Sequence, residues 1–540
     1  MKTLRAILAA SVLCACTASQ ALTISDAKIV QDPSGHAPLT ALVTFTTDSP
    51  ATATLVIESA GRETITQSFP ANKGTSHAVP VLRMIAGTPH KVRVDVADDK
   101  GGKTSTQAFD ITTPPLPDEF PPLNVTASRP RRMEPGITLI PLMRWPPGTI
   151  ADDKYGLLLA VNPAGEIIWY YKQDHQVFDP IALQNGNFAY LAHRADGIMY
   201  EADMLGNIVR SWHSSGTPKD VREGSIPIAT DTLHHTFEQI PNGNFLMLGT
   251  EVRQFDSYPT SETTVPSPTA PSSVIGDLIL EVEPNGKIVR EFKLFDLIDA
   301  TRIGYESLGT GFYQQTYAKV LKTPAKDWSH SNSLFFDQKT NSVVVSVRHV
   351  DVVLKFSLET GKLVWLLGNH DDWSEAEQKY LLKPVGDKFA WQYHQHAAKV
   401  TPQGTILLFD NGNYRARPGQ EKQKPEDSYS RAVEFKVDEA NMTVEQIWSY
   451  GEDAADRFHS PFICDVDALP STGNVLITDG GRIKDKDGKP SINIFGGHHW
   501  VRVVEVTHES PASKVWEIVI DDPRMGWATF RSERVSGLYR

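Results

Sequence analysis

Residues 277–294 read DLILEVEPNGKIVREFKL, with apolar and polar side chains alternating on either side of the turn Asn285-Gly286. This pattern predicts a β-hairpin of half-buried strands joined by a tight turn. Five other segments repeat it: GLLLAVNPAGEIIWYY (156–171), GIMYEADMLGNIVRSWH (197–213), VVLKFSLETGKLVWLLG (352–368), RAVEFKVDEANMTVEQIWSYG (431–451) and VRVVEVTHESPASKVWEIVI (501–520). The chain therefore carries six copies of one hairpin, and a repeat of this kind decides the fold.

A second unit lies between consecutive hairpins and consists of a strand, a turn rich in Pro, Asn and Gly, and another strand. FEQIPNGNFLMLGTE (237–251) shows it most clearly, and the other copies span 133–142, 182–193, 334–349, 398–412 and 467–481. The two units alternate from residue 133 to residue 520, which gives four strands in each of six repeats. A four-stranded sheet needs neighbours to cover both of its faces. The sequence therefore predicts an all-β fold with a six-bladed β-propeller over residues 129–540.

The amino-terminal part has a different texture. Residues 22–113 contain alternating strands at short spacing, which predict an immunoglobulin-like β-sandwich domain without any cluster of reactive side chains. The run TPPLPDEFPP (113–122) predicts a stiff linker, which we place at residues 114–128. Within the propeller region, residues 256–274 are rich in Ser, Thr and Pro and are expected to form a surface loop.

The first 21 residues have the pattern of a secretory signal: a basic start, an apolar stretch and small residues before position 22. An alternative is lipoprotein processing at Cys16. Either route predicts a periplasmic protein, and no later segment has the ~18 apolar residues that a membrane span requires. Removal of the leader leaves Cys464 as the single cysteine, so no internal disulfide is expected. The formal charge of −12 gives no electrostatic footprint for nucleic acid.

Three histidines stand at matching positions ahead of the turn in the second unit. His235 lies six residues before Pro241, His396 lies six before Pro402, and His330 lies seven before Asp337, where the turn is longer. The corresponding positions in the other copies are Phe178, Cys464 and Arg129. A single histidine is more often structural than catalytic, but three at one phase of a radial repeat would converge on the central channel. We therefore predict that they form a site, with the adjacent His234 facing away if its strand is regular.

Arg348 follows the strand after His330, and Asn332 shares the face of His330. A guanidinium group matches a tetrahedral oxyanion through paired hydrogen bonds. An arginine beside three histidines therefore indicates an anion site, although a solvated arginine at the rim and an amide in a turn are the simpler interpretations.

Four segments together carry a family resemblance. They are HHT (234–236) before PNGN (241–244), DWSHSN (327–332) followed by Arg348, FAWQYHQHAA (389–398) and SPFICDVDALPSTGNVLIT (460–478). With them the chain resembles the bacterial arylsulfate sulfotransferases over most of its length. This resemblance implies transfer of sulfate from an aryl sulfate to a phenol by a ping-pong route, independent of PAPS and of any other cofactor or metal.

The resemblance also assigns residues. It implies that His396 is the nucleophile and forms a sulfohistidine, that His235, His330 and Arg348 complete the catalytic set, and that Asn332 and Thr478 bind substrate. It further implies a homodimer. On chemical grounds, His235 or His330 would give and later remove the phenolic proton, and the sequence does not decide between them.

Other functions fit parts of the pattern. Three histidines can hold zinc in a metal-dependent propeller hydrolase. The tails GKLVWLLG and GEIIWYY resemble the repeats of quinoprotein dehydrogenases, although six repeats and the lack of a vicinal cysteine pair count against that class. A non-catalytic ligand-binding propeller would also tolerate the histidines.

Overall fold

The computed structural model describes residues 21–192, 197–216, 221–314, 323–453 and 455–539. The helices whose bounds fall within these residues are the single turn α1 (Leu294–Leu297) and the 3₁₀ turn η1 (Gln378–Tyr380). The fold is therefore all-β, as predicted. Within the described residues no helix has the length and apolar character needed to span a membrane. Residues 1–20 of the predicted signal, including Cys16, lie outside the described residues.

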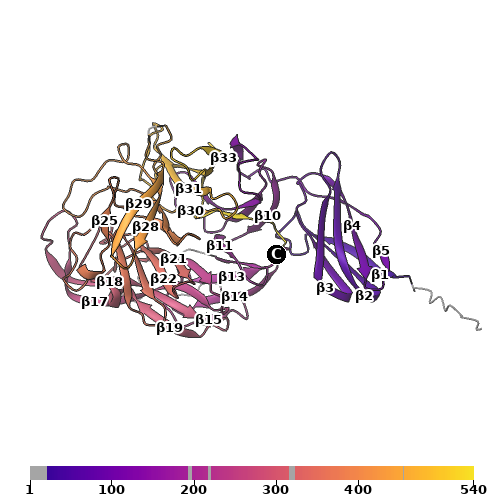
Figure 1. Ribbon diagram of the computed structural model, residues 1–540, viewed down its shortest axis with the longest axis horizontal. Coiled ribbons are helices and arrows are strands. Elements are labelled where there is room, and N and C mark those ends of the chain that lie inside the picture. Colours follow the sequence, from indigo (N-terminus) through magenta and orange to yellow (C-terminus); the bar gives the residue numbers. More distant parts are fainter. Residues whose placement is uncertain (1–20, 193–196, 217–220, 315–322, 454, 540) are drawn as a thin grey trace, which may run out of the picture. The chain divides into compact units, whose positions relative to one another are not determined.

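The chain divides into two compact units, and the described residues 21–31, 41–81 and 87–114 form the first of them. Its described strands make one six-stranded sheet, drawn in indigo in Figure 1: β1 (Ile24–Gln31), β2 (Ala41–Ser59), β3 (Ile65–Val81), β4 (Pro89–Asp98), β5 (Lys103–Ser105) and β6 (Phe109–Thr112). The alternation in β2 buries every second side chain, including Val43 and Leu55. This is the pattern of a strand with one face on a core.

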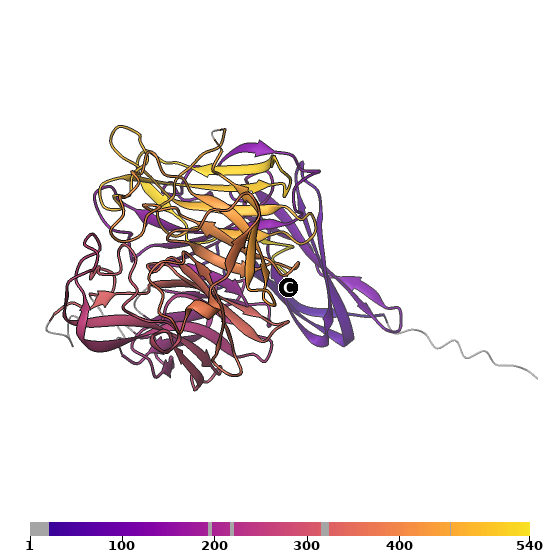
Figure 2. The ribbon, with the colours of Figure 1, turned by 60° about the vertical axis from the view of Figure 1, so that its left-hand side comes forward.

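The second unit contains six sheets of four or five strands. Figure 2 shows the strands of this unit in colours that run from purple to yellow along the chain. The first sheet holds β8 (Ile137–Trp145), β9 (Gly156–Val161), β10 (Ile167–Gln173), β34 (Gly526–Ala528) and β35 (Glu533–Val535). The second holds β11 (Phe178–Ala182), β12 (Phe188–Leu191), β13 (Ile198–Ala202), β14 (Ile208–Ser214) and β15 (Ile226–Ile228). The third holds β16 (His234–Gln239), β17 (Phe245–Pro259), β18 (Thr269–Val282), β19 (Ile288–Lys293) and β20 (Lys326–Asp327).

The remaining three sheets follow the same order along the chain. The fourth holds β21 (Ser331–Asp337), β22 (Ser342–Val347), β23 (Val352–Ser357) and β24 (Leu363–Gly368). The fifth holds β25 (Lys383–Val385), β26 (His396–Val400), β27 (Ile406–Asp410), β28 (Arg431–Asp438) and β29 (Thr443–Tyr450). The sixth holds β30 (Asp465–Ala468), β31 (Val475–Lys484), β32 (His498–Val506), β33 (Lys514–Ile520) and β7 (Asn124–Ser128).

Neighbouring sheets pack against one another in sequence order. The strands β8, β11, β16, β21, β26 and β30 contact one another in that order, and β31 and β32 contact β34, which pairs with β8. Apolar side chains fill the space between sheets; Leu248 of the third sheet and Val345 of the fourth, for example, share one buried cluster.

Indole groups link the same sheets at their outer strands. Each donates its N–H to the hairpin turn of the following sheet: Trp169 to Met204, Trp212 to Pro284, Trp365 to Glu439, Trp448 to Glu509 and Trp516 to Pro163. The third sheet has Arg290 instead, which donates to the carbonyl of Leu358. The bond from Trp516 to Pro163 joins the sixth sheet to the first. The five indole links and the Arg290 link therefore close a circle.

The structure differs from the sequence prediction at three places. The segment 133–142 is not a two-strand unit, because β8 is one continuous strand whose partners β34 and β35 come from the carboxyl terminus. Residues 124–128, inside the expected linker, form β7 and pair with β33. The two ends of the expected loop 256–274 instead extend β17 and β18 into a long hairpin, in which Tyr258 pairs with Ala270 and Pro259 with Thr269.

Candidate functional site

A cavity of about 290 Å³ lies where the first strands of the sheets begin. Its polar lining comprises His235, Glu306, Asp327, His330, Arg348, His349, His396, Asn413 and Tyr414, and its apolar lining comprises Phe178, Phe312, Phe462, Ile463, Ile492, Ile494 and Phe530. The structure thus brings together the four residues predicted to be catalytic, which come from the third, fourth and fifth sheets.

Irregular backbone at the start of each strand aims these side chains into the cavity. His235 and His330 have left-handed φ values of 54° and 51°, and the ladder register shifts beside both residues. In the fifth sheet the left-handed residue is Ala397, one position after His396. A β-bulge turns a side chain away from the regular alternation of the strand. The three histidine side chains therefore reach one cavity, although the left-handed residue is the histidine itself in two of the sheets and the following residue in the third.

The tautomer of His396 is fixed by Asn411. The amide nitrogen of Asn411 donates to the carbonyls of Ser460 and Ile463, at 2.8 and 3.1 Å, so its oxygen faces His396. That oxygen lies 2.7 Å from Nδ1 of His396 and accepts the proton of this nitrogen. Burial and the charge of Arg348 hold the pKa of His396 well below its usual range. The imidazole is therefore neutral, and its lone pair is on Nε2.

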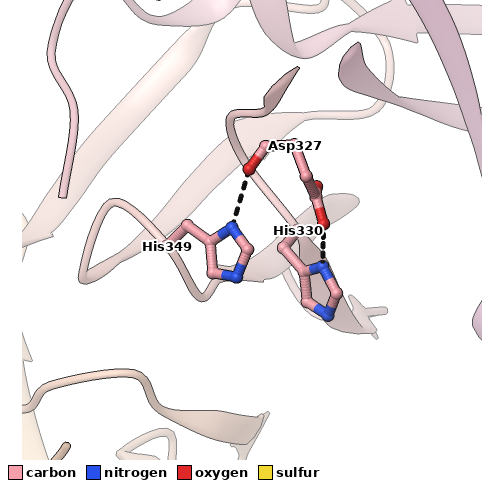
Figure 3. Close-up of side chains that lie close together, drawn as sticks. All are labelled: Asp327, His330 and His349. Carbon is pink, nitrogen blue, oxygen red and sulfur yellow. Dashed lines mark hydrogen bonds and ion pairs between the residues drawn. The ribbon is translucent and has the colours of Figure 1, made fainter. Parts of the chain in front are cut away.

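His330 and His349 both donate to Asp327 (Figure 3). Nδ1 of His330 lies 2.5 Å from the carboxylate, and Nδ1 of His349 lies 2.7 Å from the backbone carbonyl of the same residue. The two rings stack with centroids 4.4 Å apart. Burial, followed by the charge of Arg348, lowers the pKa of His330 to about 3, and burial lowers that of His349 to about 3. Both imidazoles are neutral donors.

Within the described residues, the group able to offer clustered metal ligands is Asp327, His330 and His349, whose candidate atoms lie within 4.8 Å of one another. Two ligands of a tetrahedral zinc ion, each about 2.0 Å from it, are separated by about 3.3 Å. The 2.5 Å contact between His330 and Asp327 is too short for that arrangement and has the length of a strong hydrogen bond. The contacts therefore fit a hydrogen-bonded triad and not a zinc site.

His235 contacts His330 of the cavity and its own neighbour His234. Its ring centroid lies 4.8 Å from that of His330 and 5.1 Å from that of Phe312. Its Nδ1 lies 2.8 Å from Nδ1 of His234, although His234 was expected to face away. The left-handed backbone at His235 breaks the strand alternation, which is why the two rings meet.

Arg348 brings a fixed positive charge to the cavity. Its guanidinium pairs with the carboxylate of Glu306 and donates to the carbonyl of Pro461 at 3.3 Å. Tyr414 donates to the second oxygen of Glu306 at 2.9 Å. Burial favours protonation of Glu306, but Arg348, His394 and His349 together hold its pKa well below its usual range. Arg348 is thus already paired with a carboxylate. A sulfuryl group that binds to Arg348 would have to displace the partly exposed side chain of Glu306.

The two predicted binding residues do not line the cavity. Asn332 is fully buried, and its amide donates to the carbonyl of Gln395 at 2.8 Å, directly before His396. Thr478 pairs with Asp465 across the sixth sheet, and its hydroxyl bonds to Ser532. Asn332 therefore positions the strand of His396, and Thr478 fastens the carboxyl-terminal segment.

Several lining residues were missed from sequence. Glu306 and Phe312 lie in an irregular segment with no repeat, and Phe530 lies beyond residue 520, where the counted repeats end. One signal could have placed the carboxyl-terminal residues near the site: a repeat protein that closes on itself needs its last strand beside its first. His349 had another, since it is adjacent to Arg348.

Two family models match the chain. A family model described as arylsulfotransferase (ASST) matches residues 123–522, and one described as the arylsulfotransferase Ig-like domain matches residues 28–114. The chain belongs to the arylsulfotransferase family. The protein is therefore a sulfotransferase enzyme with an immunoglobulin-like amino-terminal domain, as the sequence resemblance predicted.

Two relatives carry the name arylsulfate sulfotransferase AssT. The protein of Escherichia coli O6:H1 strain CFT073 is 23% identical over 545 residues, which span 86% of this chain and 86% of the relative. The protein of Lelliottia amnigena is 22% identical over 575 residues, which span 92% of this chain and 90% of the relative. This arylsulfotransferase is thus related to both over nearly their whole length.

Likeness to solved structures is weaker. The dihydro-heme d1 dehydrogenase NirN, solved in complex with DHE, has a TM-score of 0.32 and 9% identity, covering 89% of this arylsulfotransferase and 75% of that chain. A protein of unknown function from Bacteroides caccae has a TM-score of 0.29 and 11% identity, covering 74% and 93%. Neither value is high enough to inform the fold or the function.

Proposed function

We propose that the protein moves a sulfuryl group from an aryl sulfate to a phenol by a ping-pong reaction in which His396 carries the group. The observation that carries this proposal is the contact between His396 and Asn411, which leaves Nε2 as the unprotonated nitrogen. A neutral imidazole beside a fixed cation is a suitable nucleophile for an anionic ester, because the cation offsets the charge that repels attack.

In the first half-reaction, the lone pair of His396 Nε2 attacks sulfur. The bond between sulfur and the aryl oxygen breaks, and the departing oxygen takes a proton from a histidine of the cavity, His235 or His330. In the second half-reaction, an acceptor phenol returns that proton, its oxygen attacks sulfur, and the electron pair of the S–N bond returns to Nε2. The aryl sulfate is the sulfuryl donor, so the reaction needs neither PAPS nor another cofactor.

Arg348 and the apolar lining have separate roles in this scheme. The guanidinium neutralises charge on the sulfuryl oxygens in both half-reactions, for which Glu306 must yield its place. The rings of Phe178, Phe312 and Phe530 offer an apolar surface to the aryl group.

We also propose that the six sheets are the blades of a six-bladed β-propeller. Support comes from the sequential contacts of the first strands and from the six outer links, the last of which runs from Trp516 to Pro163. The proposed site then lies at one end of the channel, where a radial repeat brings side chains of different blades together.

Export and assembly are further proposals. The basic and apolar start of the chain supports cleavage after Ala21 and a periplasmic location, with lipid attachment at Cys16 as the alternative. Family resemblance supports a homodimer. The mass of the mature protein distinguishes the two cleavage routes, and sedimentation equilibrium measures the oligomer.

The first test is intact-protein mass spectrometry after brief mixing with 4-nitrophenyl sulfate and no acceptor. We expect one sulfuryl group, a gain of about 80 Da, on the peptide that contains His396 when peptides are mapped under alkaline conditions. His396→Asn is expected to abolish both the adduct and nitrophenol release, because the nucleophile is gone.

The matched control is His508→Gln. His508 pairs with Glu434 away from the cavity lining, so its variant should form the adduct at the wild-type rate. Wild-type turnover by His396→Asn would overturn the assignment of the nucleophile. Adduct formation that disappears on dialysis against EDTA would favour the metal-dependent alternative.

A further inference from the structure

The buried row Asp277, His234 and His235 leads from the interior of the third sheet to the cavity. Nδ1 of His234 lies 2.8 Å from Nδ1 of His235, and Nε2 of His234 lies 3.3 Å from Oδ1 of Asp277 and 3.1 Å from the carbonyl of Gly249. The side chains of His234 and Asp277 are both fully buried. One proton must lie between the two Nδ1 atoms, because two lone pairs at 2.8 Å would repel each other.

Asp277 is held as a carboxylate. Its Oδ2 accepts hydrogen bonds from the hydroxyl of Ser329 at 2.7 Å and from the backbone N–H of Ser331 at 2.6 Å. Burial favours its protonation, but the nearby imidazole of His234 and the hydrogen bonds from Ser329 and Ser331 keep its pKa below the usual range of an aspartic acid. Among the described residues, no well-aligned donor reaches the other oxygen, Oδ1. The nearest group able to carry a positive charge toward Oδ1 is the imidazole of His234.

His330, the other candidate for proton transfer, has no such arrangement. Its Nδ1 donates directly to Asp327, and the neighbouring charge of Arg348 opposes protonation of its ring. A second proton on His330 would place a cation beside Arg348. A second proton on the His234 and His235 pair would instead come to rest beside Asp277, a buried carboxylate with an unused oxygen.

We propose that His235 is the acid and base for the phenol and that His234 is a positioning residue that stores the proton against Asp277. This inference rests on the proposed ping-pong function. It assigns the phenolic proton to His235, whereas the sequence left the choice between His235 and His330 open. The cycle starts with His234 as an imidazolium that donates Nδ1–H to His235, whose Nε2 carries a proton toward the cavity.

The proton balance closes over one cycle. When the donor's aryl oxygen leaves sulfur, it takes the Nε2 proton of His235. The Nδ1 proton of His234 moves to Nδ1 of His235, and both imidazoles become neutral. When the acceptor phenol attacks the sulfohistidine, its proton enters at Nε2 of His235, the Nδ1 proton returns to His234, and the pair with Asp277 forms again. No other proton donor is required.

The test uses the dependence of each half-reaction on the acidity of the phenol, in full-length His234→Gln. 4-Nitrophenolate leaves without a proton more readily than phenolate, because the nitro group withdraws charge. We expect His234→Gln to form the His396 adduct from 4-nitrophenyl sulfate at nearly the wild-type rate. Transfer from phenyl sulfate, and from the adduct to phenol, should fall by about 10²-fold, the usual contribution of a positioned acid or base.

Asp277→Asn provides a second variant, since asparagine can still accept from Ser329 and Ser331 through its oxygen. It should show the same selective loss for basic phenols, and the double variant should be no slower than His234→Gln. His213→Gln is the matched control, because His213 bonds to Ser225 and does not line the cavity.

The outcomes separate this inference from the proposed function. Equal losses with 4-nitrophenyl and phenyl sulfates would show that His234 only supports the structure, and an unaffected His234→Gln would show that it does nothing; either result overturns the relay and leaves the His396 adduct intact. Absence of the adduct in the wild-type protein would overturn the proposed function itself.

Discussion

At the residue scale, the cavity keeps its histidines neutral and concentrates positive charge on one guanidinium. His396, His330 and His349 all have a lowered pKa, for which burial is the largest cause. A neutral histidine can attack or transfer a proton, whereas an imidazolium at His396 could not attack. Charge stabilisation of the sulfuryl group therefore depends on Arg348.

Replacing Arg348 tests this division. We expect Arg348→Met to slow adduct formation by about 10²- to 10³-fold, the usual effect of removing one charge-stabilising donor. Arg348 also lowers the pKa of His396, and the active form of His396 is the unprotonated one. In the wild type, activity should therefore persist below the pH near 6.5 at which an exposed histidine titrates. In Arg348→Met the acid loss should begin at a higher pH than in the wild type.

Rates of nitrophenol release between about pH 5 and pH 8 measure both effects, since this range spans the ordinary titration of histidine. Arg348→Lys is the control, because it keeps the charge and loses the planar fork. Arg348→Lys should lose activity at the same low pH as the wild type, but its rate of nitrophenol release should be lower. Loss of wild-type activity at the ordinary pKa of histidine would contradict the lowered pKa of His396.

The sequence predicted that His235, His330, His396 and Arg348 share one site, because they stand at fixed distances from recognisable turns, and all four line the cavity. It did not find Glu306, whose left-handed φ of 73° and contact with Arg348 depend on a segment without repeats. Thr478 was expected to bind substrate, but it bonds to Ser532 of the carboxyl-terminal segment. His234 was expected to face away from His235, but the irregular backbone at His235 brings the two rings together.

At the element scale, the outer-strand tryptophans are the regular link between sheets. Trp516 is completely buried and donates to the carbonyl of Pro163 at 3.1 Å, which joins the sixth sheet to the first. The hairpin repeats predicted from sequence contain these tryptophans, but their hydrogen-bond partners lie in the next repeat and are visible only in the fold.

Trp516→Phe should lower the free energy of unfolding by about 1–2 kcal/mol, because it removes one hydrogen bond and leaves the partly buried carbonyl of Pro163 without this donor. Urea unfolding monitored by far-UV circular dichroism measures the change. The control is Trp500→Phe, which alters a half-buried indole that stacks on Arg482 and should cost much less. Equal losses in the two variants would contradict the role of the Trp516 link.

At the scale of the whole second unit, the carboxyl-terminal segment joins strands from several sheets. Arg531 donates to the carboxylate of Asp179 at 3.0 Å, to the hydroxyl of Thr236 at 2.9 Å and to the carbonyl of Asn332 at 3.0 Å. These residues belong to the second, third and fourth sheets, whereas Arg531 lies between β34 and β35 of the first. One guanidinium thus connects four sheets next to the cavity.

We expect Arg531→Met to cost about 3–5 kcal/mol of unfolding free energy, because it leaves Asp179 buried without its partner. Burial already raises the pKa of Asp179, and loss of Arg531 should raise it further. A group with a raised pKa destabilises the fold above that pKa, so the loss should be larger at pH 8 than at about pH 5.

Denaturant unfolding of Arg531→Met and of Arg531→Met/Asp179→Asn at both pH values checks this prediction. The second change removes the unpaired charge and should recover part of the stability and most of the pH dependence. No recovery would show that the main loss comes from packing of the Arg531 side chain.

The amino-acid sequence was enough to predict the all-β class, the repeat of six hairpins, the amino-terminal domain and the convergence of three histidines. These features follow from local patterns, namely alternation along a strand and turn residues at fixed spacing. The folded chain was needed to see that β34 and β35 complete the first sheet, that Glu306 faces Arg348, and that His234 bridges His235 and Asp277. Each of these depends on contacts between residues far apart in the chain, and a periodic pattern carries no information about which distant segments meet.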